Sequence, residues 1–184
     1  MYSPESPGRE PFSRALQGGD RRSIGSSNRV AALILRQPYR LPEYIECLWD
    51  GDSVVRMRAA DAAEKVSAER PALLAPFKTE LLALADETAQ AELRWHLAQI
   101  IPRLPLGQRE RVRATTAFES FLGDRSSIVR TFAIQALVEL SRGTPEIEAD
   151  LIDLLERACR TGTPAMKARS RKLLAQFRKR DQPG

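Results

Sequence analysis

The chain has 184 residues, of which 42% are hydrophobic and 29% are charged, and its formal net charge is +5. This composition is typical of a folded domain with its own core and excludes a largely disordered chain, and no apolar run approaches the roughly 20 residues of a membrane-spanning helix. Residues 1–40 hold seven Lys/Arg against three acids and residues 160–184 hold eight against one, so residues 41–159 carry a net charge of −6. The positive charge therefore belongs to the two ends of the chain, and the segment between them is acidic.

The first 28 residues are rich in Pro, Gly, Ser and Arg and show no sustained hydrophobic period. We predict a flexible N-terminal arm over 1–28, with one helical turn at Pro11–Leu16 as its only regular structure. No apolar core of a signal peptide is present near the start. The two cysteines, Cys47 and Cys159, lie far apart without a CxxC pair, so we expect reduced thiols and a cytoplasmic location.

From Arg29 onward the apolar residues recur with a helical period, interrupted at short intervals by Pro and Gly. No run alternates apolar with polar residues, so strands are not expected. Half of the predicted helices carry these apolar stripes: Leu41/Ile45/Leu48, Leu74/Phe77/Leu81/Leu84, Val112/Phe118/Phe121/Leu122 and Ile147/Leu151/Leu154/Leu155. The predicted domain spans 29–178, and a basic disordered tail follows over 179–184.

The other predicted helices resemble one another in sequence. Each contains an apolar residue followed by a cation, and these cations, spaced 38, 36 and 37 residues apart, are Arg56, Arg94, Arg130 and Lys167. In the first three, apolar residues recur at i, i+4, i+7, i+8 and i+11 from the residue before the cation, as in Val55, Ala59, Ala62, Ala63 and Val66. A period near 37 residues is typical of repeats of paired helices, which stack because one pair cannot bury both of its faces.

The run from Asp50 to Ala62 resembles a HEAT repeat, in which an acidic loop, a Val-Arg pair and small residues begin the second helix. The segment Asp124–Leu140 is similar, whereas Leu93-Arg94 is followed by bulkier residues and Met166-Lys167 replaces the arginine. The resemblance covers about 29–178. It implies an all-α fold, a right-handed α-α superhelix (HEAT-like solenoid) of about four to five helical-hairpin repeats, and it indicates fold rather than function.

In HEAT proteins the matching arginine commonly bonds to loop acids of its own or the neighbouring repeat. The resemblance therefore implies a structural ladder made of Arg56, Arg94, Arg130, Lys167, Asp52 and Asp124. Binding of a ligand by these cations is the alternative interpretation.

Stacks of this kind curve so that the second helices line the concave side, which is the usual binding surface. We expect that surface to present the residues after each cation and one turn later: Met57, Arg58, Asp61, Trp95, His96, Gln99, Thr131, Phe132 and Gln135. Large aromatic residues outside the core stripe are typical contact anchors. Packing of Trp95 and Phe132 against adjacent repeats is the competing interpretation.

No GxSxG motif, Cys-His pair or glycine-rich phosphate loop is present, and one histidine with two distant cysteines does not supply a zinc site. We therefore predict a non-enzymatic protein–protein interaction scaffold without cofactor, metal or membrane association, whose partner carries a basic patch that suits Asp61. The alternative is a nucleic-acid-binding protein similar in architecture to the HEAT-like alkylpurine DNA glycosylases, with Trp95 and Asp61 near the lesion. The acidic middle of the chain argues against this alternative, because contacts to phosphates need cations.

Overall fold

The computed structural model describes residues 10–18, 23–142 and 145–180, and this part of the chain contains helices and turns but no strand. Its α-helices are α1 (Phe12–Leu16), α2 (Ser27–Arg36), α3 (Leu41–Glu46), α4 (Ser53–Glu69), α5 (Lys78–Glu87), α6 (Ala91–Ile100), α7 (Gln108–Phe121), α8 (Ser127–Leu140), α9 (Pro145–Thr161) and α10 (Pro164–Arg180). Short 3-10 turns join them at Pro38–Arg40 (η1), Cys47–Trp49 (η2), Pro71–Leu73 (η3), Ala75–Phe77 (η4) and Ile101–Arg103 (η5). The prediction of an all-α fold is confirmed.

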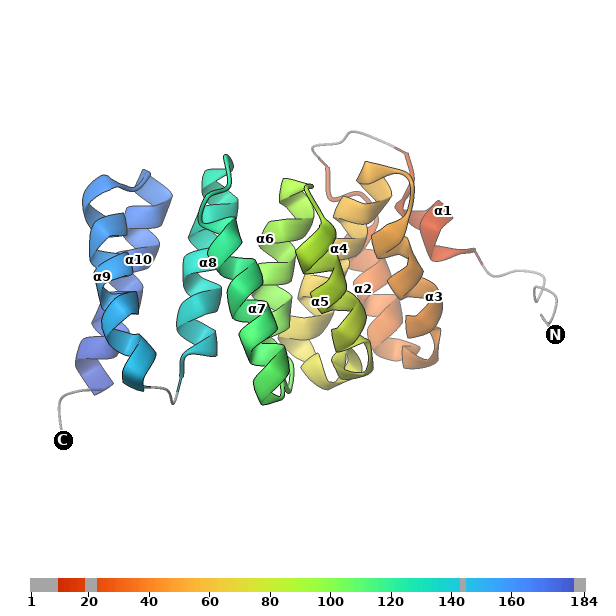
Figure 1. Ribbon diagram of the computed structural model, residues 1–184. Coiled ribbons are helices and arrows are strands. Elements are labelled where there is room, and N and C mark those ends of the chain that lie inside the picture. The colour runs from red at the N-terminus through yellow and green to blue at the C-terminus, as the bar shows by residue number, and fades with distance from the viewer. Residues whose placement is uncertain (1–9, 19–22, 143–144, 181–184) are drawn as a thin grey trace.

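The helices lie side by side in a row that begins with α1 and ends with α9 and α10 (Figure 1). One layer, called the even layer here, consists of α2, α4, α6, α8 and α10, each packed on the next. The remaining long helices form the second layer, the odd layer: η2 beside α3 packs on α4, α5 on α6, α7 on α8 and α9 on α10. An even helix inside the row therefore has neighbours on both sides and behind it.

Local sequence signals account for where the helices begin. The Asp52 carboxylate accepts a hydrogen bond from the Val54 N–H at 2.8 Å and caps α4, because the first N–H groups of a helix have no partner within it. Ser126 caps α8 in the same way. Pro145 and Pro164 open α9 and α10, where the missing N–H costs little.

The core stripes predicted for every second helix are buried. Val55, Ala59, Ala62, Ala63 and Val66 of α4 are fully buried, and the matching residues in and after α6 and in α8 are at most 7% exposed. In the stripe predicted for α7, however, Val112 is 58% exposed. The many alanines of α4 let α2 and α6 approach it closely from both sides. Burial of these stripes joins the row into one main core that extends from α1 to α9.

A smaller, separate apolar cluster packs the last pair of helices on α8, in addition to Leu151 of α9, which belongs to the main core. This C-terminal cluster consists of Ile134, Val138, Leu155, Ala158, Leu173 and Phe177. A hollow of ≈ 220 Å³ lies beside it between α7, α8 and α9.

Within the segment predicted as a flexible arm over residues 1–28, the structure describes residues 10–18 and 23–28. The helical turn expected at Pro11–Leu16 is present as α1, and Phe12 and Leu16 are buried in the main core. Residues 1–9 and 19–22 lie outside the described residues. At the other end α10 continues to Arg180, two residues into the segment 179–184 that is predicted as a tail; residues 181–184 are not described.

Candidate functional site

The three predicted ladder arginines make the same bond in successive pairs of helices. Each guanidinium donates to the carbonyl oxygen six residues earlier, in the loop before its own helix. The donors and acceptors are Arg56 and Asp50 at 2.6 Å, Arg94 and Thr88 at 2.8 Å, and Arg130 and Asp124 at 2.8 Å. The bond gives a partner to a loop carbonyl that no helix satisfies.

Two of these arginines also reach the loop of the next pair. Arg56 Nε donates to Gln90 Oε1 at 3.0 Å, and Arg94 Nη1 donates to Asp124 Oδ2 at 2.6 Å. Burial raises the pKa of the Asp124 carboxyl, but hydrogen bonds from the Ser126 N–H and from Arg94 outweigh it and hold that pKa below its usual range. These guanidinium groups are thus engaged in joining one loop to the next.

The other two predicted ladder members behave differently. The carboxylate of Asp52 caps α4 rather than receiving a bond from Arg56. Within the described residues the ammonium group of Lys167 makes no hydrogen bond or ion pair. The bonded ladder therefore covers α4, α6 and α8 and does not extend to α10.

Three residues expected on the exposed face are buried instead: Arg58 is 2% exposed, His96 is 8% exposed and Thr131 is 6% exposed. The expectation that Arg58 and His96 face a partner is corrected for this reason, whereas the small exposed part of Thr131 lies at the wall of a groove. An even helix has neighbours on both sides, so the covered arc is wider than the apolar stripe that sequence periodicity defines. Thr131 donates its hydroxyl to Ser127 O of its own helix at 2.7 Å.

Arg58 is used inside the molecule. Its guanidinium donates to Leu16 O at 2.8 Å, to Ser23 O at 3.1 Å and to Gly18 O. It also packs against Gly25, where an added Cβ would meet it at 2.8 Å. Arg58 of α4 therefore holds the residues at the end of α1 and those just before α2 against the row.

His96 is a buried neutral histidine. Burial lowers its pKa to about 4, and the charges of Asp61 and Glu64 oppose this only in part. Its Nδ1 has no hydrogen-bond partner in the described structure, and its ring lies 5.4 Å from that of Trp95. A group so enclosed cannot reach a substrate from solvent, which argues against a catalytic base here.

The remaining predicted residues are half-buried on the even layer: Met57, Asp61, Trp95, Gln99, Phe132 and Gln135. Trp95 and Phe132 pack against the main core, so each divides its surface between core and solvent. Asp61 accepts hydrogen bonds from Ser27 and Lys65. Because its charge is already paired, the expected attraction of a basic patch to Asp61 is not favoured.

An open groove of ≈ 500 Å³ lies between α8 and α10, and we call it the α8–α10 groove. It is lined by Ile128, Thr131, Phe132, Ala165, Ala168, Arg169 and Lys172. Ile128 is 44% exposed. Arg169 lies over the Phe132 ring at 5.4 Å and donates to Gln135, and Lys172 is exposed. The groove thus has an apolar floor and cations on the α10 side.

Of the predicted residues, only Thr131 and Phe132 line this groove. Gln135 also lies on α8, where it accepts a hydrogen bond from Arg169, and the others lie along α4 and α6. Sequence reasoning missed Ile128 as a surface residue. It directly precedes the core residue Val129, so it looks like part of the stripe. Comparison with the matching position of α6, which is Glu92, is the signal that could have revealed it as outward-facing.

The described residues give little support for thiol chemistry, metal binding or membrane insertion. Both cysteines are unpaired, and burial raises the pKa of Cys47 to about 12. Among the described residues, no three His, Cys, Asp or Glu side chains gather as a metal site, and no helix is both long and apolar enough to cross a membrane. No family model, curated protein or solved structure matches the chain.

Proposed function

We propose that this protein is a HEAT-like α-solenoid that acts as a non-enzymatic scaffold and binds a partner protein on its even layer. Two observations support the architecture. The even helices pack each on the next, and the arginine-to-loop bond recurs in α4, α6 and α8 with the spacing of the sequence repeat. A right-handed curvature with the even layer on the concave side belongs to the same proposal.

The α8–α10 groove is the single observation that carries the proposed binding function. It places a 44% exposed isoleucine beside a half-buried phenylalanine on the layer that such stacks use for binding. Burial of Ile128 and Phe132 under a partner would supply apolar contact area, and Lys172 would fix the orientation. Among the predicted residues on α4 and α6, in contrast, His96 is buried and Asp61 is paired with Ser27 and Lys65, which favours binding over catalysis.

A matched pair of variants tests this proposal. Ile128→Glu introduces a charge at the groove, and Val112→Glu does the same at a 58% exposed valine of α7 in the odd layer. Wild type and both variants are incubated with extract of the native host, and bound proteins are captured by cross-linking. Melting curves check that each variant is folded. We expect one protein to be retained by wild type and Val112→Glu and lost with Ile128→Glu.

The alternative, nucleic-acid binding, is tested by measuring the binding of duplex DNA to wild type and Ile128→Glu. If duplex DNA binds at micromolar strength, with steep salt dependence and equal affinity for wild type and Ile128→Glu, the cations rather than the groove bind the ligand. That result, or equal retention of every captured protein by both variants, would overturn the scaffold proposal.

A further inference from the structure

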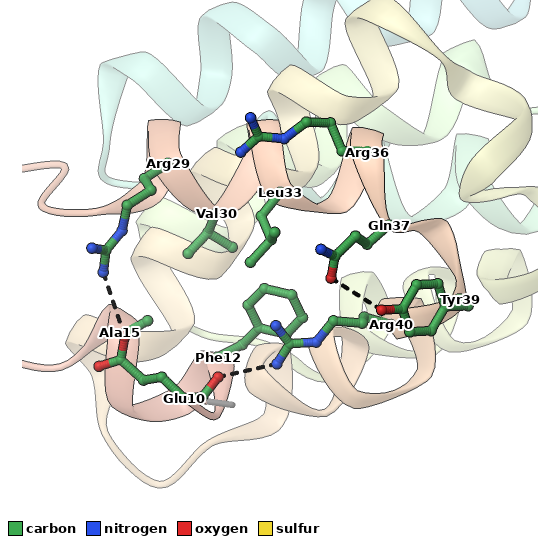
Figure 2. A pocket seen from close by; sticks show the side chains of 10 residues that line it. All are labelled: Glu10, Phe12, Ala15, Arg29, Val30, Leu33, Arg36, Gln37, Tyr39 and Arg40. Atoms are coloured by element: carbon green, nitrogen blue, oxygen red, sulfur yellow. Dashed lines mark hydrogen bonds and ion pairs between the residues drawn. The ribbon is translucent and has the colours of Figure 1, made fainter. Parts of the chain in front are cut away.

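A second hollow lies at the opposite end of the row, between α1 and α2. This groove, called the terminal groove here, has a volume of ≈ 500 Å³. Figure 2 shows its walls: α2 on one side, α1 on the other, and the η1 turn closing one end. Its lining residues are Glu10, Phe12, Ala15, Arg29, Val30, Leu33, Arg36, Gln37, Tyr39 and Arg40.

The floor of the terminal groove is apolar and firmly held. Phe12 packs edge-on against Tyr44, with ring centroids 5.7 Å apart, and the Arg40 guanidinium lies 3.9 Å from the Phe12 ring centroid. Arg40 itself is paired with both oxygens of the Glu43 carboxylate, at 2.9 and 2.7 Å, and also donates to Glu10 O. Arg40 is therefore a neutralised wall of the groove rather than a cation available to a ligand.

The rim, in contrast, carries two exposed cations on one helix. Arg29 and Arg36 lie seven residues apart on α2, about 10 Å along the helix axis, with Val30 and Leu33 between them (Figure 2). Arg36 is exposed and has no ion pair or hydrogen bond to another side chain among the described residues. The groove thus holds two cations at a fixed distance from each other, with an apolar surface between them.

The chain's own Glu10 shows how an acid fits this rim. Its carboxylate lies 3.6 Å from Arg29, and the two side chains are 53% and 67% exposed. An ion pair this exposed contributes little stability, so an incoming carboxylate can replace Glu10 at small cost. No such internal acid lies against Arg36 in the described part of the chain.

We propose that the terminal groove binds an acidic amphipathic helix of a partner protein, whose leucine-like side chain enters the floor while two carboxylates seven residues apart pair with Arg29 and Arg36. Seven residues of the bound helix span the same 10 Å as the arginines and place both acids on one face. The partly exposed apolar lining, Ala15 and Leu33, favours a peptide over nucleic acid, because phosphates gain nothing from these side chains. A second copy of this chain is disfavoured at the far end of the row, where exposed Arg171 and Lys172 give α10 the same sign of charge. The site is separate from the α8–α10 groove and does not depend on the proposed function.

The test uses the full chain and a fluorescent, alanine-based helical peptide with two glutamates seven residues apart and two leucines midway between them. We expect saturable binding that is lost when both glutamates are lysine and is weakened about tenfold or more when both leucines are alanine. Arg36→Glu should weaken binding about tenfold or more, whereas Arg109→Glu, at an exposed arginine of α7, should leave it unchanged.

Glu10→Gln is the most discriminating variant, because it should strengthen binding by up to about fivefold by releasing Arg29. Melting curves confirm that each variant is folded, and Ile128→Glu should bind the peptide like wild type. The proposal is overturned if Glu10→Gln does not strengthen binding, or if Arg36→Glu and Arg109→Glu behave alike. It is also overturned if the alanine-substituted peptide or a DNA oligonucleotide binds as well as the probe. Sedimentation that reveals a dimer abolished by Arg36→Glu would assign the groove to a second copy instead.

Discussion

The buried His96 makes a sharp prediction about pH and stability. In the unfolded chain its pKa is 6.5, whereas burial in the folded protein lowers it to about 4. Between these values the unfolded state binds the proton and the folded state does not, so stability falls as the pH falls. At 1.36 kcal/mol per pKa unit, the loss relative to neutral pH is about 2 kcal/mol at pH 5 and about 3 kcal/mol at pH 4.

The assay is urea denaturation at pH 7, 6 and 5, together with melting curves. A loss of about 2 kcal/mol corresponds to a melting temperature about 4–8 °C lower at pH 5 than at pH 7. Since His96 is the only histidine of the chain, His96→Leu is a clean control. That variant should lose most of the dependence in this range. Because it also removes an unpaired buried nitrogen, it should be no less stable than wild type at pH 7.

The carboxylates contribute in a different range. The folded-state pKa of Asp124 is lowered, so the stability it contributes is present above its unfolded pKa and is lost as the pH falls through the lower folded value. Both wild type and His96→Leu keep this contribution between pH 5 and 7. An NMR titration that places the His96 ring near pKa 6.5 in the folded protein, or an unchanged pH dependence in His96→Leu, would refute the reasoning.

Three further predictions concern how the row is held together. Arg58→Met should cost about 1–3 kcal/mol, because it leaves the carbonyls around Gly18 without their donor, and limited proteolysis should then cut between α1 and α2 before any other site. Arg94→Met should cost about 1.5–3 kcal/mol in urea denaturation, and a double-mutant cycle with Asp124→Asn should reveal coupling; additive losses would contradict the bond across the loops. Leu155→Ala should cost about 2–5 kcal/mol and reduce hydrogen-exchange protection in α8, α9 and α10 but not in α2 to α6, since Leu155 belongs to the separate C-terminal cluster; a uniform loss along the chain would show that the two clusters unfold together.

Much of the fold could be predicted from local patterns. The apolar stripe from Val55 to Val66 predicted a helix and its buried face, because helical periodicity depends only on residues three and four apart. The recurrence of Arg56, Arg94 and Arg130 predicted equivalent places in successive helices, and the structure gives all three the same loop bond. The residues of the candidate surface were harder to predict, because the pattern of a single helix does not indicate how far neighbouring helices cover the edges of its exposed face.

The sequence by itself thus determined the helices, their apolar faces and the spacing of the pairs, all of which follow from short-range periodicity. Only the tertiary structure decided that Arg58 is buried, because its acceptors Leu16 and Gly18 lie 42 and 40 residues away along the chain. Only the tertiary structure, likewise, placed α1 against α2 to form the terminal groove and left Ile128 exposed opposite Ala165. Periodicity tells which face of a helix avoids water, whereas burial and exposure at the edges of that face depend on which distant segment packs beside it.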